Sequence, residues 1–252
     1  MVVSEPEPWR ALDDEVAQWA TPPVFWLRDD DATGPAPAVA TLLDACAAAR
    51  VPVCLAVIPA FLDPEFAPWL ASQAAATTVV PHGLGHTNHA PEGQKKAEFG
   101  DDRSLTEISK DLRDGLDRTQ DAFGAQSRAI FVPPWNRLGS MAGAALAGAG
   151  YTALSAKATP IEVTGITVID VHIDIIDWRG TRGYGGDGPI LGALRKRLAV
   201  LRAQGKENEP TGILTHHAVH DPAAWTFLKT LFSRLDGKVD WLNVDDVSRA
   251  MR

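Results

Sequence analysis

The chain has 252 residues, of which 45% are hydrophobic and 22% charged, a composition typical of a soluble globular protein with a substantial core. Its formal net charge of -8 and scattered basic residues argue against nucleic acid or an anionic membrane as the main partner. No apolar stretch approaches the roughly 18 residues of a membrane span. The N-terminal residues 1–8 also lack the basic and apolar regions of a signal peptide, so we expect a cytoplasmic protein.

Short β-rich segments alternate with helical segments along the chain. The helices are expected at residues 39–49, 64–75, 104–123, 141–149, 189–203, 222–235 and 245–251. About seven strands separate them, and this alternation predicts a parallel sheet with crossover helices. At this length we expect an α/β fold in which the sheet closes into a distorted (β/α) barrel. No long linker interrupts the pattern, so residues 1–252 are expected to form a single domain. The two cysteines, Cys46 and Cys54, are expected in the core.

Most of the histidines, six of seven, fall in two short segments, 82–89 and 216–220. His82 and His86 are four residues apart, a spacing at which two imidazoles can face one ion from a single turn. A run of three aspartates, 29–31, follows another apolar segment. Because the carboxyl ends of barrel strands meet at one edge, these groups are expected to form one metal site.

Five motifs together resemble those of the NodB-type polysaccharide deacetylases, carbohydrate esterase family 4, and they occur in that family's order. They are Leu27-Arg28-Asp29-Asp30-Asp31, His82 with His86, Pro133-Pro134-Trp135, Asp174-Ile175-Ile176-Asp177-Trp178 and Leu214-Thr215-His216. The resemblance covers most of the chain, and the ordered set is far more specific than any single motif. It implies a metal-dependent hydrolase that removes an acyl group, with acetyl expected, from an N-acylated sugar or related small amide.

The resemblance also implies the ligands of the ion and the general base. Carried over to this chain, Asp29 is the base, and Asp30, His82 and His86 hold one divalent cation. A register shifted by one residue is the alternative, with Asp30 as the base and Asp31 as the ligand. Zinc is the expected ion, and Co²⁺, Ni²⁺, Mn²⁺ or Fe²⁺ would also suit such a donor set.

The remaining roles follow from the later motifs. His216 is implied as the general acid, with Asp177 as a further catalytic residue. The backbone N–H of Trp135 is implied as a donor to the oxyanion. The residues expected to border the substrate are Pro134, Trp135, Trp178 and His217. The two indoles could equally be core aromatics.

One departure from the family leaves the activity open. Val132 stands where the family usually has an arginine that orients the base aspartate, although Arg28 or Arg137 could replace it. An inactive relative that binds a metal or a sugar is therefore an alternative. A second alternative is an iron oxygenase, because His172, Asp174 and a distant His216 mimic its facial triad. Those oxygenases are typically all-β, which argues against this reading.

Two further expectations concern the surroundings of the histidines. His89 could be a third histidine ligand or a loop residue, and a loop residue is the simpler interpretation. The polar segment 90–103 is expected to be a surface loop over the site. Such a loop would narrow an open groove into a pocket, so we expect a small, soluble N-acylated substrate rather than a cell-wall polymer.

Overall fold

The strands of the barrel run parallel and begin with a central group of four. In this computed structural model, which describes residues 7–157 and 163–252, β1 (Val24–Ala32) lies between β2 (Val53–Val57) and β8 (Thr211–Thr215). On the far side of β2 lies β3 (Thr77–Pro81). Most of the site residues lie on these four strands or directly after them.

A second group of short strands closes the ring. β4 (Ile130–Phe131) pairs with β5 (Ala153–Leu154), and β5 pairs with β6 (Thr167–Val168). Backbone hydrogen bonds between the segments 79–83 and 128–132 connect β3 to β4. The segment after β6 continues into β7 (Ile173–Asp174), which pairs with β8. β6 and β7 therefore together form one strand of the ring, between β5 and β8. The predicted distorted barrel of about seven parallel strands is confirmed.

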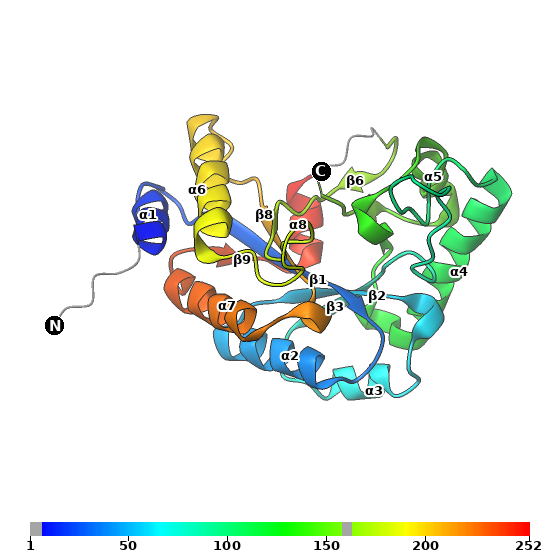
Figure 1. Cartoon of the computed structure of the whole chain (residues 1–252), viewed down its shortest axis with the longest axis horizontal. Helices are drawn as coiled ribbons and strands as arrows, with labels where there is room; N and C mark the ends of the chain where they lie inside the picture. Colours follow the sequence, from blue (N-terminus) through cyan, green and yellow to red (C-terminus); the bar gives the residue numbers. More distant parts are fainter. Residues whose placement is uncertain (1–6, 158–162) are drawn as a thin grey trace.

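Helices cover the outside of this ring (Figure 1). They are α1 (Glu7–Val16), α2 (Pro37–Ala49), α3 (Phe66–Ala71), α4 (Leu105–Phe123), α5 (Ser140–Ala145), α6 (Asp187–Ala203), α7 (Pro222–Leu235) and α8 (Val244–Ala250). The predicted helices are present, although α3 is shorter than expected. α1 was not predicted; it packs beside α6, where Trp9 donates to Asp187 at 2.7 Å. β9 (Asp240–Trp241) pairs with the start of β1. None of the described helices is long and apolar enough to cross a membrane.

The alternation of side chains along β1 decides which residues enter the barrel. Phe25 and Leu27 belong to the core between the sheet and the outer helices, whereas Trp26 packs inside the barrel with Leu214 and Val132. Successive strand residues point to opposite faces. Arg28 and Asp30 therefore share the inner face with Trp26, and Asp29 shares the outer face with Leu27.

A β-bulge at the end of β1 breaks this alternation. Asp30 pairs with Ala56 and Ala32 pairs with Val57, so Asp31 has no partner residue on β2. Its φ is 76°, in the left-handed region that few non-glycine residues adopt. Bulges redirect a side chain, and here the bulge brings Asp31 to the same edge as Asp30. Cys46 and Cys54 are buried and free, as expected.

Candidate active site

Asp31, His82 and His86 form a compact group of potential metal ligands. One ligand atom from each lies within 4.8 Å of the others. The Asp31 Oδ1 atom lies 3.3 Å from His82 Nε2 and 3.4 Å from His86 Nε2. This oxygen is buried and has no hydrogen-bond partner among the described residues. A buried carboxylate oxygen directed at two imidazole nitrogens fits a divalent cation.

The backbone of β4 orients one of these histidines. His82 Nδ1 lies 3.1 Å from the carbonyl oxygen of Val132. If Nδ1 donates to that carbonyl, Nε2 is left unprotonated on the side that faces Asp31. Such a backbone contact is typical of metal-binding histidines, because it fixes the tautomer and the ring orientation. Val132 therefore contributes through its main chain, whatever its side chain.

A tight turn places the second histidine beside the first. Gly83 has a φ of 64°, and a Cβ atom there would collide with the carboxylate of Glu98. That carboxylate is buried and accepts hydrogen bonds from Leu84 N at 3.3 Å and from Gly85 N at 2.8 Å. His86 itself has a φ of 52°. Glu98 thus holds the loop that joins the two histidines, and a larger residue than glycine would not fit at position 83.

The charges in this group are tightly coupled. Burial alone would raise the pKa of Asp31, but the neighbouring histidines lower it well below its usual range. Burial opposes protonation of His82, yet Asp30 and Asp31 raise the pKa of this imidazole overall. Burial lowers the pKa of His86. Asp31 is therefore ionised near neutrality, as a metal ligand must be.

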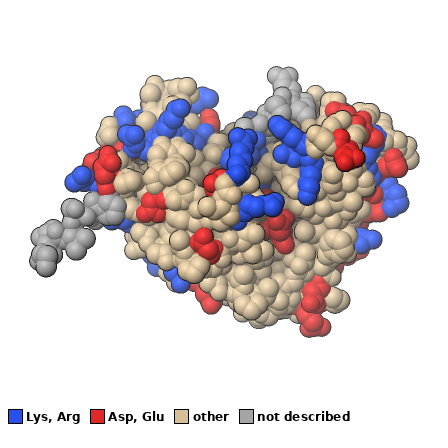
Figure 2. Space-filling model, viewed as in Figure 1, with Lys and Arg blue, Asp and Glu red and all other residues tan. Residues whose placement is uncertain are grey.

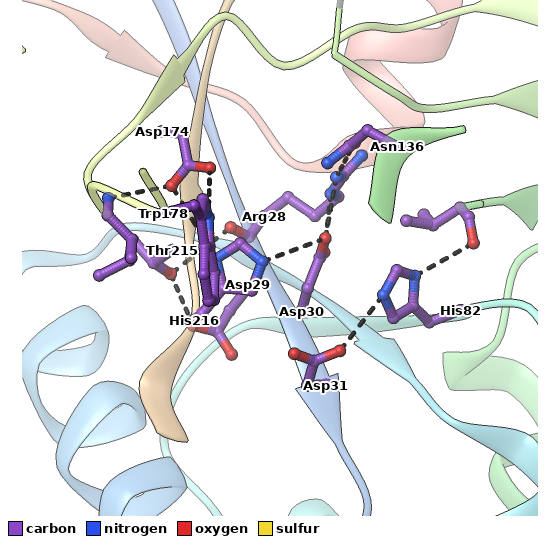
Figure 3. Close-up of polar contacts among 12 residues, drawn as sticks. Arg28, Asp29, Asp30, Asp31, His82, Asn136, Asp174, Trp178, Thr215 and His216 are labelled. Atoms are coloured by element: carbon purple, nitrogen blue, oxygen red, sulfur yellow. Dashed lines mark hydrogen bonds and ion pairs between the residues drawn. The ribbon is translucent and has the colours of Figure 1, made fainter. Parts of the chain in front are cut away.

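Asp30 lies next to this group but is held by an arginine. Arg28 Nε is 2.8 Å from Asp30 Oδ1, and Arg28 Nη2 is 2.9 Å from Oδ2 (Figure 3). The rest of the guanidinium donates to Ser155 and to Asn136. The predicted ligand Asp30 is thus replaced in the ligand group by Asp31. The reason is the bulge, and the geometry favours the alternative register.

His216 faces Asp30 from the end of β8. Its Nε2 lies 3.9 Å from Asp30 Oδ2, and its Nδ1 lies 3.9 Å from Asp174 Oδ1. The indole of Trp178 packs edge-on against the His216 ring at 4.8 Å and donates to Asp174 Oδ2 at 3.0 Å. The imidazole therefore has a carboxylate on each side. Asp30 lies on the side of the ligand group, and Asp174 lies on the opposite side of the ring.

Two predicted catalytic carboxylates lie elsewhere. Asp29 is fully buried on the outer face of β1, where it contacts Thr215 and His217. Burial would raise its pKa, but His217 and these hydrogen bonds lower it below its usual value. Asp177 accepts from the backbone N–H groups of Arg179 and Gly180 and closes a local turn. Strand alternation places Asp29 on the face opposite the ligand group, and of the two aspartates in the fourth motif it is Asp174, not Asp177, that lies beside His216.

The Pro-Pro-Trp motif forms the wall beside the histidine pair. Pro134 is buried, and the Trp135 ring lies 4.3 Å from the ring of His86. Trp135 and Asn136 both have positive φ values, 57° and 52°. With Asp31 and His86, four of the six described non-glycine residues with positive φ lie at this site. Strained backbone is concentrated here, as is common at functional sites.

The other histidines lie apart from the ligand group. His89 is exposed, in agreement with a loop residue. His172 Nδ1 accepts from Gly212 N at 3.0 Å. Gly212 lies four residues before His216 along the same stretch of chain. At roughly 3.3 Å per strand residue, Gly212, and with it His172, lies about 13 Å from His216. The facial-triad interpretation is therefore wrong in its geometry.

The segment 90–103 is more than a surface loop. Its residues Ala97, Glu98 and Phe99 are buried, and Phe99 O accepts from Gly139 N at 2.7 Å. The segment is fixed against the chain that follows the Pro-Pro-Trp motif. The sequence did not predict the supporting roles of Glu98, Asn136 and Ser155, because these roles depend on tertiary packing.

Comparisons with known proteins support the fold at low sequence identity. No protein-family model and no curated protein matches the chain. A putative polysaccharide deacetylase from Mycobacterium smegmatis matches with a TM-score of 0.65 at 15% identity, over 93% of this chain and 92% of that one. A family 4 acetyl xylan esterase from Clostridium thermocellum, solved with a cobalt ion, matches with 0.53 at 16% identity, over 89% of each chain.

A third match is a pseudoenzyme of the same family, described as a mutant with restored activity. Its TM-score is 0.57 at 15% identity, over 91% of this chain and 69% of that one. The matches therefore include a protein described as a pseudoenzyme as well as one described as an esterase. Together they show that the chain has the fold of the family 4 carbohydrate esterases and polysaccharide deacetylases.

Proposed function

We propose that this protein is a metal-dependent hydrolase that removes an acyl group, acetyl in the simplest case, from an N-acylated carbohydrate or a related small amide. The observation that carries this proposal is the convergence of three elements on one edge of the barrel. They are the ligand group of Asp31 with its two histidines, the Arg28–Asp30 pair and the Asp174–His216 pair.

Asp31, His82 and His86 would hold the cation, with Asp30 as the base. When bound, the ion would lower the pKa of a coordinated water and polarise the acyl carbonyl. The Arg28 guanidinium holds the Asp30 carboxylate by two hydrogen bonds, and this carboxylate would accept the proton of the attacking water. We propose zinc as the ion. The cobalt in the acetyl xylan esterase supports a divalent transition metal in general.

His216 would act as the general acid. Its Nε2 lies 3.9 Å from Asp30 Oδ2, and Asp174 Oδ1 lies 3.9 Å from its Nδ1 on the other side of the ring. Protonation of the departing amine is needed because an amide anion is a poor leaving group. Trp178 fixes Asp174 from outside. The backbone N–H of Trp135 would add a donor to the oxyanion.

The competing proposal is an inactive relative, as the matched pseudoenzyme illustrates. The departure at Val132 first suggested it. Arg28 now argues against it, because its guanidinium makes the contact to the base that an arginine at position 132 would be expected to make. We therefore favour an active enzyme.

The surface charge favours an anionic substrate over a cationic one. Figure 2 shows Lys and Arg side chains gathered around a hollow in the upper middle of this face, although the net charge of the chain is -8. Lys96 lies 5.9 Å from the centre of the Trp135 ring. Clustered cations attract anions and repel cationic polymers.

The test is acetate release by the purified protein after treatment with chelator and reloading with zinc or cobalt. We expect turnover of N-acetylated sugars or small amides only in the reloaded protein. Metal binding without turnover of any N-acyl compound, by wild type and at several pH values, would favour the inactive relative.

A further inference from the structure

Asp29 lies on the outer face of β1, directly opposite the site, and its carboxylate accepts hydrogen bonds from two residues of another strand end. Asp29 Oδ2 accepts from Thr215 Oγ1 at 2.6 Å and from the backbone N–H of His217 at 2.9 Å. Its Oδ1 lies 2.5 Å from His217 Nδ1. All three side chains are buried. The carboxylate is therefore fully used in holding the end of β8.

These contacts lie on both sides of His216. β8 ends at Thr215, and the short 3₁₀ helix η5 (His217–Val219) begins one residue after His216. His216 itself has φ -142° and ψ 89°, so it belongs to neither element. One carboxylate thus bridges the residue before His216 and the residue after it. It fixes the main chain from which the His216 ring reaches across to Asp30.

We propose that Asp29 is a positioning residue for His216, which sets the place of the general acid without touching the substrate. This inference rests on the proposed role of His216. Without the carboxylate, the Thr215 hydroxyl, the backbone N–H of His217 and His217 Nδ1 would be left buried without this hydrogen-bond partner. The free-energy cost of burying these groups without it is large enough for the end of β8 to rearrange. A shift of about 1 Å in a catalytic group can cost a factor of about 10² in rate.

The experiment compares two substrates that differ in their need for an acid. Hydrolysis of an N-acetyl amide needs a proton on the leaving amine, whereas a nitrophenyl acetate releases a stable phenolate without one. Both need the base. We expect His216→Ala to slow the amide by about 10² or more, and Asp29→Asn to slow it by about tenfold or more. The ester rate and the metal content should change little in both.

Matched threonine variants separate positioning from general loss of packing. Thr215→Val removes one contact of Asp29, whereas Thr211→Val removes a buried hydroxyl of the same strand that contacts Arg197 instead. We expect a selective loss of amide turnover in Thr215→Val, smaller than in Asp29→Asn, and none in Thr211→Val. If Asp29→Asn does not fold, the comparison of the two threonine variants decides whether the contacts of Asp29 position His216.

Two results would overturn the inference. Equal loss of amide and ester turnover in Asp29→Asn, with the metal retained, would make Asp29 a base. Unchanged amide turnover in Asp29→Asn would show that the contacts of Asp29 do not affect the position of His216. If the wild type hydrolyses neither substrate, the proposed function fails, and the ¹H–¹⁵N signals of the His216 ring then test the positioning. They should move in Asp29→Asn and stay in Thr211→Val, and unmoved signals in both would contradict it.

Discussion

Arg28 and Asp30 lie two residues apart on the inner face of β1 and form a bidentate ion pair inside the barrel. Their side chains are 0% and 1% exposed. Buried charges are tolerated when they are paired and their remaining hydrogen-bonding groups are satisfied, and Ser155 and Asn136 accept the other guanidinium hydrogens. Strand alternation thus supplies, from within one strand, the arginine that is missing before Pro133.

The first prediction concerns this pair. Arg28→Met leaves Asp30 buried without its partner, so we expect a loss of about 3–5 kcal/mol in the free energy of unfolding, measured in urea. Arg28→Lys keeps the charge but not the two-point contact, and we expect a fall in turnover of about tenfold or more with the metal retained. Arg137→Met is the control, because the Arg137 side chain donates to the Lys96 carbonyl and makes no ion pair with a described residue. Equal stability of Arg28→Met and Arg137→Met would mean that the buried pair contributes nothing.

The second prediction separates the two registers of the aspartate run. Asp31→Asn should lose most of the bound ion, because it replaces a charged ligand that faces both histidines. Asp30→Asn should keep the ion and lose turnover by about 10² or more. Elemental analysis together with acetate release measures both effects. The opposite pattern, with the ion lost from Asp30→Asn alone, would restore the register first inferred from the resemblance.

The sequence predicted the edge of the barrel but not the register on it. Apolar runs followed by Asp, His or Pro marked the strand ends correctly, because buried strands and their polar ends differ sharply in composition. The choice among Asp29, Asp30 and Asp31 depended on a bulge. A bulge changes the face of the sheet on which a side chain lies, and the local composition does not predict the bulge.

Supporting residues were harder to predict than the ligands. Glu98 holds the turn between His82 and His86 from 12 residues further along, within a polar segment that resembled a surface loop. Its role depends on the packing of that segment against residues 136–141, which is a tertiary contact. In the same way, Asp174 and Asp177 are equivalent by composition, and only the path of the chain after β7 distinguishes them.

The third prediction uses that pair of aspartates. Asp174→Asn replaces the carboxylate behind His216, so turnover of the amide should fall by about tenfold or more while the ion is retained. Asp177→Asn preserves an acceptor for the backbone N–H groups of Arg179 and Gly180, because Asn forms the same kind of turn. It should be close to wild type in rate. A greater loss in Asp177→Asn than in Asp174→Asn would return the catalytic role to Asp177.

The fourth prediction concerns pH and stability. Burial lowers the pKa of His172 to about 3, and its Nδ1 accepts from Gly212 N and so is unprotonated. In the unfolded chain this imidazole has a pKa near 6.5. Between these values the unfolded state binds more protons, so stability rises with pH across this window and falls on acidification. His172→Gln retains an acceptor without a titrating group and should flatten this dependence in urea unfolding at pH 4–7. An unchanged slope would mean that His172 titrates alike in both states.

The last prediction concerns the size of the substrate. Trp135 packs against His86, a proposed metal ligand, and Trp178 packs against His216, the proposed general acid. An indole thus lies beside each of the two imidazoles, and the prediction is that the two indoles border the acyl group of a small ligand rather than a long chain. We therefore expect acetate release from N-acetylated monosaccharides to be at least as fast as from chitin or peptidoglycan fragments. Trp178→Ala opens the acid side and should reduce this preference. Release that increases steadily with oligomer length in the wild type would instead indicate an open groove with several sugar subsites.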